Sequence, residues 1–191
     1  FDPMPKMFFN KKLKNFRLSN IDQKIKLLSN LKVDFVITKK FDKKFSKTKA
    51  LNFISQILNK KLSSKFIFVS NNFRFGNKRE GNVKLLKKYE QSFNYKVVKP
   101  EPLIKSKKIV SSSLIRNLLE KGLLHKANNL LKRYWTIQGV VKKGRQVGKK
   151  IGFPTCNIDI GDYVLAKPGV YAVKVLRKNS KKYLRGIANL D

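Results

Sequence analysis

Three consecutive serines followed by an arginine form the first group of residues with chemical potential. Ser111, Ser112 and Ser113 precede an apolar run, and hydroxyl residues are preferred N-caps of helices. Free backbone N–H groups and the helix dipole favour an anion at such an end. Arg116 lies on the same helix face and would add a permanently charged, forked donor. The group is a candidate phosphate site, although an ordinary serine cap beside a surface arginine is the commoner arrangement.

A second candidate is the glycine-rich segment from Gly144 to Asn157. Its three glycines in nine residues let the backbone approach a ligand closely, and Lys149 offers a charge for a phosphate. Thr155 and Asn157 alternate, so both can face one side of an extended segment, and their oxygens suit Mg²⁺. The segment does not match the Walker A pattern, and a glycine-rich β-hairpin with a Pro-Thr bend would have the same composition.

The third candidate is a polar loop after the apolar stretch 65–69. Here Asn71 and Asn72 precede Phe73, Arg74 and Phe75. Two aromatic rings around an arginine could stack on a planar ligand. The commoner outcome for such a loop is that its phenylalanines fold back onto the core.

Short apolar strands alternate with amphipathic helices over the first half of the chain. This alternation predicts an α/β fold, with helices packed on a parallel sheet. Ligands bind at the carboxyl ends of the strands in such sheets, so the loop after Val69 is a candidate site by position alone. The expected strands are 33–37, 65–69 and 95–98; the expected helices are one capped by Ser19 or Asn20 and ending at Leu28, one opened by Ser46 or Thr48 and reaching Leu58, and one with Val83, Leu85, Leu86 and Tyr89 inward.

The pattern changes after Pro102, and the chain becomes β-like from Tyr134 onwards. We therefore expect a domain boundary near Arg133. The expected elements are a helix opened by the triple serine with Gly122 as its C′ residue, a helix at 123–131, and strands at 136–141 and 169–175.

The sequence carries a large positive charge. It contains 45 Lys and Arg against 11 Asp and Glu, a formal net charge of +34. Because clustered cations release counterions from a phosphate backbone, a basic nucleic-acid-binding protein is the alternative hypothesis. The lysines are scattered along the chain, however, without a basic run of five or an interleaved aromatic ladder. A lysine-rich composition over solvated surfaces is the simpler interpretation, and such charge also concentrates nucleotide phosphates.

Other features exclude several classes of protein. The apolar runs are far shorter than the ~20 residues of a bilayer span, and no signal-peptide pattern opens the chain, so we expect a cytoplasmic protein without a membrane. The single cysteine, Cys156, excludes an internal disulfide, and we expect it to be packed rather than nucleophilic. His125 has no cysteine or carboxylate at helical spacing, so we expect a surface residue. No zinc-type ligand cluster or serine-hydrolase elbow is present.

The order of the motifs is more specific than any one of them. An FDPxP opening, an FRFG loop, an SSSxIR helix start, a GFPTxN turn and a GVYAV strand follow one another along the chain. Over essentially its whole length, the chain thereby resembles the prokaryotic bifunctional riboflavin kinase/FMN adenylyltransferase family, also called FAD synthetase. The resemblance implies ATP-dependent phosphorylation of riboflavin to FMN and adenylylation of FMN to FAD, with Mg²⁺ as cofactor. Riboflavin, FMN and ATP are the implied partners, with no specific nucleic acid.

The resemblance also implies a domain organisation and roles for the motif residues. Residues 1–132 correspond to a Rossmann-like nucleotidyltransferase domain truncated at its N-terminus, and residues 133–191 to the start of a β-barrel riboflavin kinase domain truncated at its C-terminus. The ISSTxxR motif of the family implies that the ATP phosphates are bound by Ser111, Ser112, Ser113 and Arg116. The GxDFxFG motif implies a flavin loop made of Asn72, Phe73 and Arg74. The PTAN motif implies that Thr155 and Asn157 hold Mg²⁺ and ATP, with Gly144 and Lys149 near the phosphates.

The chain departs from the family pattern at four positions. Met4 replaces the usual His of FDPHP, Ser70 and Asn72 replace the Gly and Asp of GxDFxFG, and Cys156 replaces the Ala of PTAN. The family's HxGH motif lies upstream of this chain and the kinase's catalytic Glu lies downstream. We therefore assign no catalytic residue here and expect the chain, as given, to perform neither reaction.

A third hypothesis is a nucleotidyltransferase for pantetheine phosphate, nicotinate nucleotide or a CTP-linked substrate. Such an enzyme would share the SSSxIR-type helix start, but it should lack the GFPTxN segment that follows here.

Overall fold

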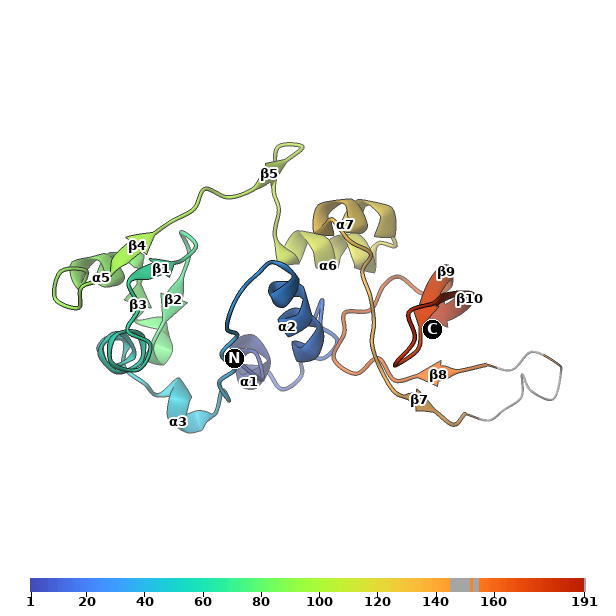
Figure 1. The fold of residues 1–191 in the computed structure, drawn as a ribbon, viewed down its shortest axis with the longest axis horizontal. Helices are drawn as coiled ribbons and strands as arrows, with labels where there is room; N and C mark the ends of the chain where they lie inside the picture. Colours follow the sequence, from blue (N-terminus) through green and yellow to red (C-terminus); the bar gives the residue numbers. More distant parts are fainter. Residues whose placement is uncertain (145–151, 153–154, 191) are drawn as a thin grey trace. The chain divides into compact units, whose positions relative to one another are not determined.

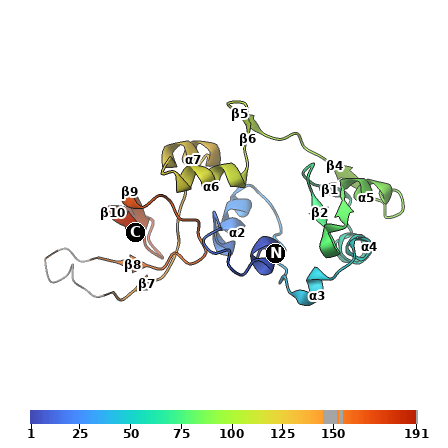
Figure 2. The same cartoon turned by 180° about the vertical axis from the view of Figure 1, so that it is seen from behind.

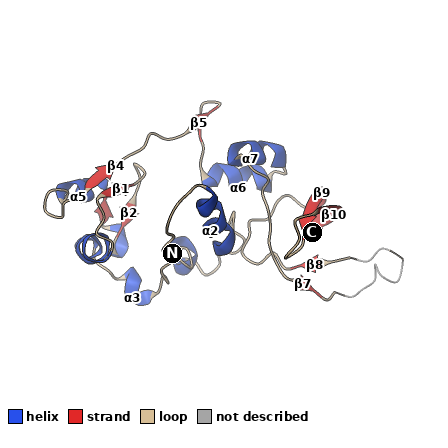
Figure 3. Ribbon diagram, in the orientation of Figure 1, coloured by secondary structure: helices blue, strands red, loops and turns tan. Residues whose placement is uncertain are grey.

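A computed structural model describes residues 1–144, 152 and 155–190 (Figure 1). The chain divides into two compact units that interleave along the sequence. The first unit contains Phe1–Asn10 and Ile37–Ile109, and the second contains Lys11–Val36 and Val110–Asp191. Helices and strands are mixed in both units (Figure 3). Arg133 lies inside the second unit, and the domain boundary expected near it stays a prediction.

The first unit places short helices around a parallel pair of strands. Strand β1 pairs with β4, with Ile67 opposite Val97, so the prediction of parallel pairing is confirmed. The other strands of the unit form two antiparallel pairs, β2–β3 and β5–β6. The elements are α1 (Pro5–Phe9), α3 (Lys43–Ser46), α4 (Ala50–Asn52), a π-helix η1 (Phe53–Lys61), β1 (Phe66–Phe68), β2 (Arg74–Phe75), a 3₁₀ turn η2 (Asn77–Arg79), β3 (Gly81–Asn82), α5 (Val83–Lys88), β4 (Lys96–Val98), β5 (Ile104–Lys105) and β6 (Lys108–Ile109).

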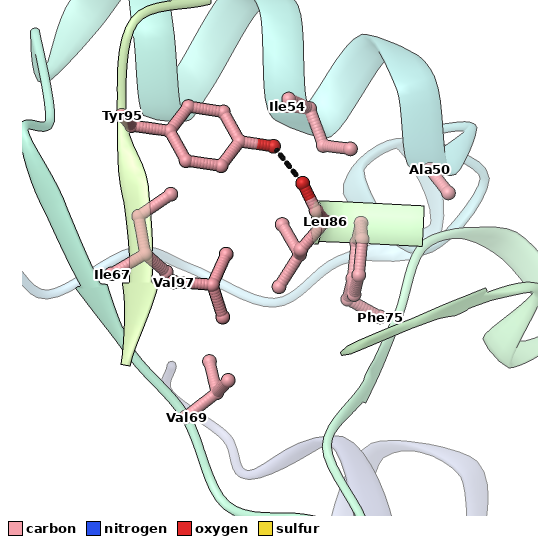
Figure 4. Packing of buried hydrophobic residues seen from close by; sticks show 8 residues of the cluster. All are labelled: Ala50, Ile54, Ile67, Val69, Phe75, Leu86, Tyr95 and Val97. Atoms are coloured by element: carbon pink, nitrogen blue, oxygen red, sulfur yellow. Dashed lines mark hydrogen bonds between the residues drawn. The ribbon is translucent and has the colours of Figure 1, made fainter. Parts of the chain in front are cut away.

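The core of the first unit forms where α4 and η1 pack with α5 against the β1–β4 pair. Ile54 and Leu86 are fully buried there. The Tyr95 hydroxyl donates to the carbonyl oxygen of Leu86 at 2.6 Å, as Figure 4 shows. Val83, Leu85 and Tyr89 pack against the same cluster, so the predicted inward face of this helix is confirmed.

Two expectations for the first half of the chain are wrong. Residues 33–37 form no strand, and Phe35 is 87% exposed, because no strand in the described residues lies beside them to complete a ladder. The helix with Ile54 begins at Ala50, and neither Ser46 nor Thr48 caps it. The Ala50 N–H instead donates to Glu80 Oε1 at 2.6 Å, so a carboxylate distant in the sequence replaces a local N-cap.

In the second unit, helices α6 and α7 pack side by side (Figures 1 and 2). The predicted helix after Asn20 is confirmed, with a capping box in which Asn20 and Gln23 bond each other's backbone N–H. Gly122 follows the C-cap of α6 at φ +73°, as expected of a C′ glycine. The elements are α2 (Ile21–Asn30), α6 (Ser112–Glu120), α7 (Leu124–Leu131), β7 (Val141–Lys142), β8 (Asn157–Ile158), β9 (Gly169–Leu176) and β10 (Tyr183–Leu190).

The described strands of the second unit form two antiparallel pairs, β7–β8 and β9–β10. The expected strand 169–175 is confirmed as β9. The expected strand 136–141 is mostly wrong, because its backbone groups bond elsewhere: Gln138 N–H donates to the Tyr163 hydroxyl and Thr136 O accepts from Gln23 Nε2. In the part of the chain that the structure describes, no helix is long and apolar enough to cross a membrane.

Candidate functional site

The loop that follows β1 is a short antiparallel hairpin whose aromatic side chains differ in position. Phe73 N–H donates to Ser70 O at 3.0 Å, which turns the chain into β2. Phe75 is 7% exposed and belongs to the core. The half-buried Phe73 ring stacks on Phe75 at 5.5 Å and 19°. One phenylalanine therefore supports the core, while the other remains partly accessible beside Arg74.

The far end of this hairpin is fixed against the start of α4. Gly76 has φ +76°, and a Cβ there would lie 2.8 Å from three atoms of Ala50, so only glycine fits this close approach. Asn77 N–H donates to Thr48 O at 2.7 Å, and Glu80 Oε1 accepts from Ala50 N at 2.6 Å. The loop is thus held by backbone and carboxylate contacts rather than left free in solvent.

The hairpin and the first turn of α5 line a cavity of about 440 Å³ that is open to solvent. This volume lies within the range of small-molecule sites. The predicted residues Asn72, Phe73 and Arg74 meet there. The complete lining is Asn71, Asn72, Phe73, Arg74, Arg79, Asn82, Val83 and Lys84.

Sequence reasoning missed three polar residues of this cavity, Arg79, Asn82 and Lys84. Asn82 stands directly before an apolar helix, as N-caps do, and its Oδ1 accepts from Leu85 N–H at 2.9 Å. That signal was available in the sequence. Arg79 and Lys84 had no such signal, because nothing distinguishes them from the other Lys and Arg in a sequence that contains 45 of them.

In the second unit, the serine group caps α6 as predicted. Ser111 Oγ accepts from Leu114 N–H at 3.2 Å, and Ser112 and Ser113 are exposed in the first turn. Arg116 has a more specific position than a surface arginine. Its Nε donates to Phe16 O at 2.8 Å and its guanidinium lies 3.6 Å from the centre of the Phe16 ring.

Arg116 is half-buried, and burial lowers the pKa of its guanidinium from the usual value, while Glu120 opposes the shift. The hydrogen bond from Nε and the stacking on the Phe16 ring together hold the Arg116 side chain against the segment 11–36. The arrangement orients the remaining donors of the fork from a fixed stem, as a phosphate contact requires.

The glycine-rich segment is only partly described. Gly144 lies so close to Asn157 that a Cβ on it would be 2.0 Å from Asn157 Nδ2. Thr155 and Asn157 are exposed, and Asn157 faces Lys142 across the β7–β8 pair. Lys149 lies outside the described residues. The structure therefore brings Gly144 and Asn157 together, with Thr155 two residues before.

A charged pair lies beside this segment. Lys142 Nζ and Asp159 Oδ2 are 2.5 Å apart on the exposed surface. The hydrogen bond from Lys142 and a further one from Gly161 N–H lower the pKa of the Asp159 carboxyl. Asp159 is thus paired with Lys142 directly after β8, the strand that carries Asn157.

The two remaining sequence predictions have opposite outcomes. Cys156 is exposed, so the expectation of a packed residue is wrong; the residues of the β7–β8 pair beside it are all exposed as well. His125 is on the surface, as predicted, and its Nε2 is 3.1 Å from Asn129 Nδ2. Within the described residues, no group of three or more His, Cys, Asp or Glu side chains could hold a metal ion.

The chain is similar to known proteins over its whole length. Residues 1–114 match the family model described as FAD synthetase, and residues 131–191 match the one described as riboflavin kinase. The chain is 40% identical over 191 residues to the bifunctional riboflavin kinase/FMN adenylyltransferase of Buchnera aphidicola subsp. Schizaphis graminum. That match covers 100% of this chain and 61% of the relative.

Two further proteins are similar over a comparable share of both chains. The Escherichia coli K12 protein of the same description is 35% identical over 190 residues, covering 100% of this chain and 60% of the relative. A crystal structure described as a macrolide-efflux protein from Streptococcus pneumoniae aligns with a TM-score of 0.74 at 25% identity, covering 90% of this chain and 55% of that one. The chain thus spans about three-fifths of the length of these curated relatives.

Proposed function

The chain belongs to the bifunctional riboflavin kinase/FMN adenylyltransferase family, and from that premise we propose that it is part of an enzyme that phosphorylates riboflavin to FMN and adenylylates FMN to FAD. The observation that carries the proposal is the succession of two matches along one chain, FAD synthetase first and riboflavin kinase second. A nucleotidyltransferase for another substrate would not carry the second match. We also propose that the enzyme is cytoplasmic.

The proposal assigns the two reactions to two domains. Residues 1–132 form the Rossmann-like adenylyltransferase domain, and residues 133–191 open the kinase β-barrel. The parallel β1–β4 pair, with its candidate loop directly after β1, supports the first assignment. The long antiparallel β9–β10 pair supports the second.

In the adenylyltransferase half, Asn72, Phe73 and Arg74 contact the flavin. Phe73 offers an accessible aromatic surface for a planar ring, because its packing on Phe75 leaves it half-buried. Ser111, Ser112, Ser113 and Arg116 bind ATP phosphates. The exposed N–H groups of the first turn of α6 and the anchored guanidinium supply donors where the transferred phosphate carries its charge.

In the kinase half, Thr155 and Asn157 hold Mg²⁺ and ATP, with Gly144 and Lys149 near the phosphates. A hydroxyl and an amide oxygen are hard ligands that suit Mg²⁺, and both side chains are exposed. Gly144 leaves room for the Asn157 amide, which a Cβ would displace. When bound, Mg²⁺ neutralises phosphate charge during transfer, and the protein residues orient the triphosphate against the riboflavin hydroxyl.

The test is a chromatographic assay of the full-length gene product with riboflavin, ATP and Mg²⁺. We expect FMN to accumulate first and FAD to follow. FMN without FAD would keep the kinase assignment but contradict the adenylyltransferase activity, and it would point to Met4 and Asn72 as the departures responsible for that loss. A folded protein that forms neither product would refute the flavin proposal, and salt-sensitive binding to a random duplex would then favour the nucleic-acid alternative.

A further inference from the structure

The cavity beside the β2–β3 hairpin is lined by three cations and by no carboxylate. Arg74, Arg79 and Lys84 are exposed around it, and its other lining residues are asparagines, Phe73 and Val83. Within the part of the chain that the structure describes, none of the three cations forms an ion pair. A cavity with this lining attracts an anion.

The one acidic residue near the cavity is directed elsewhere. Glu80 is the only Asp or Glu between residues 70 and 89. Its Oε1 accepts the Ala50 N–H at 2.6 Å, which uses the carboxylate at the start of α4. Glu80 is absent from the cavity lining, although its neighbour Arg79 is part of it. The local charge of the cavity is therefore positive.

Two of these cations stand on backbone that is held in place. Arg79 has φ +61° and follows Lys78 at φ +49°; each left-handed non-glycine residue costs about 1–2 kcal/mol. Hydrogen bonds from Arg79 N–H to Gly76 O and from Asn77 N–H to Thr48 O fix this turn. Lys84 lies in the first turn of α5, which Asn82 caps.

We propose that Arg79 and Lys84 bind the phosphate group of the flavin nucleotide in this cavity. The inference rests on the proposed function and extends it to residues outside the family motif that was matched. FMN combines one planar ring with one phosphate dianion. Phe73 offers the aromatic surface, and the arginine fork and lysine ammonium offer charge-assisted donors. The cavity of about 440 Å³ is large enough for a ligand of this class.

Phosphate esters come to this enzyme from two substrates, FMN and ATP. Riboflavin has the same ring system without the phosphate. The substrate whose KM changes shows which of the two phosphates the cavity binds. The riboflavin kinase step serves as an internal measure of folding, because we assign it to residues 133–191.

The experiment measures FMN adenylylation by the full-length gene product and by its Arg79→Gln and Lys84→Gln variants. Lys78→Gln is the matched control, since Lys78 is the neighbouring cation of the same turn but does not line the cavity. We expect the KM for FMN to rise about 10-fold in each cavity variant, corresponding to ~1.4 kcal/mol of binding. The KM for ATP, the riboflavin kinase rate and the behaviour of Lys78→Gln should stay unchanged. Added salt should raise the KM for FMN more in the parent than in the variants.

Each other outcome overturns the inference in a different way. A rise in the KM for ATP alone would assign the cavity to the ATP phosphates. An unchanged KM for both substrates would remove Arg79 and Lys84 from phosphate binding, while leaving the proposed function intact. Equal losses in Lys78→Gln would show an effect of general surface charge. A parent protein that forms no FAD would refute the proposed adenylyltransferase and this inference together.

Discussion

Replacing Gly76 with alanine tests the contact that holds the candidate flavin loop. Gly76 directly follows Arg74 and Phe75, and its backbone adopts φ +76° against the start of α4. An added Cβ would lie 2.8 Å from the N, Cα and Cβ atoms of Ala50. Two of these are backbone atoms, so the clash cannot be relieved by a side-chain rotation.

The magnitude follows from two separate effects. A non-glycine residue in the left-handed region costs about 1–2 kcal/mol. Forcing extra volume into a packed contact costs about 1–3 kcal/mol. Gly76→Ala should therefore lower the free energy of unfolding by about 2–5 kcal/mol, a large part of the ~5–15 kcal/mol that a domain has. Because the Ala50 N–H also donates to Glu80 Oε1, the loop and its cavity should be distorted together.

Gly161→Ala is the matched control. Gly161 has φ +50° with nothing within 4 Å of the added Cβ, so this variant meets the conformational cost without the clash. Any gain from the reduced entropy of the unfolded chain is common to both variants. Urea unfolding followed by circular dichroism should place Gly76→Ala about 1–3 kcal/mol below Gly161→Ala. Equal losses in the two variants would refute the close approach at Gly76.

Two further predictions concern single side chains. Tyr95→Phe removes the 2.6 Å bond to Leu86 O, which also accepts from Tyr89 N–H, so it should cost about 0.5–1.5 kcal/mol at neutral pH, as measured by urea unfolding. Burial, with a contribution from Glu90, raises the pKa of Tyr95 to about 12; the unfolded chain loses this proton near pH 10, so the stabilisation is complete below pH 10 and is lost as the pH rises towards 12. The parent should therefore lose stability over this window more steeply than Tyr95→Phe, and identical pH profiles would contradict the buried phenol. Ser111→Ala removes the N-cap of α6 and should cost about 0.5–2 kcal/mol in thermal unfolding, whereas Ser113→Ala at the exposed first turn should leave the melting temperature nearly unchanged; the reverse order would contradict the assigned cap.

Local signals in the sequence predicted much of the fold. The cap at Asn20, the triple serine and Gly122 fixed the ends of helices because each acts within one turn of its own backbone. The parallel pairing of β1 and β4 followed from the alternation of helices and strands. These predictions succeeded because the interactions are local or belong to the general pattern of α/β folds.

Long-range contacts accounted for the failures. The Glu80 bond to Ala50 joins residues thirty apart, so no local pattern showed that it replaces a cap at Ser46 or Thr48. Phe35 lies in an apolar stretch that predicts a strand, but a strand also needs a neighbour.

The candidate sites divide in the same way. Asn72, Phe73 and Arg74 were found by their motif and lie together on the cavity. Arg79 and Lys84 join them only through the fold of the hairpin and α5, and nothing in a chain this basic distinguished them.

We propose that two parts of this chain, residues 1–132 and 133–191, serve two different reactions. The most direct test is a pair of variants of the full-length gene product, Arg74→Gln in the hairpin and Thr155→Ala in the glycine-rich segment, each assayed separately for riboflavin phosphorylation and for FAD formation from supplied FMN. We expect Arg74→Gln to weaken FAD formation from FMN while phosphorylation continues. We expect Thr155→Ala to abolish phosphorylation while FMN is still adenylylated. If both variants lose both reactions in proportion while remaining folded, or if neither reaction changes, the assignment of the two halves is contradicted.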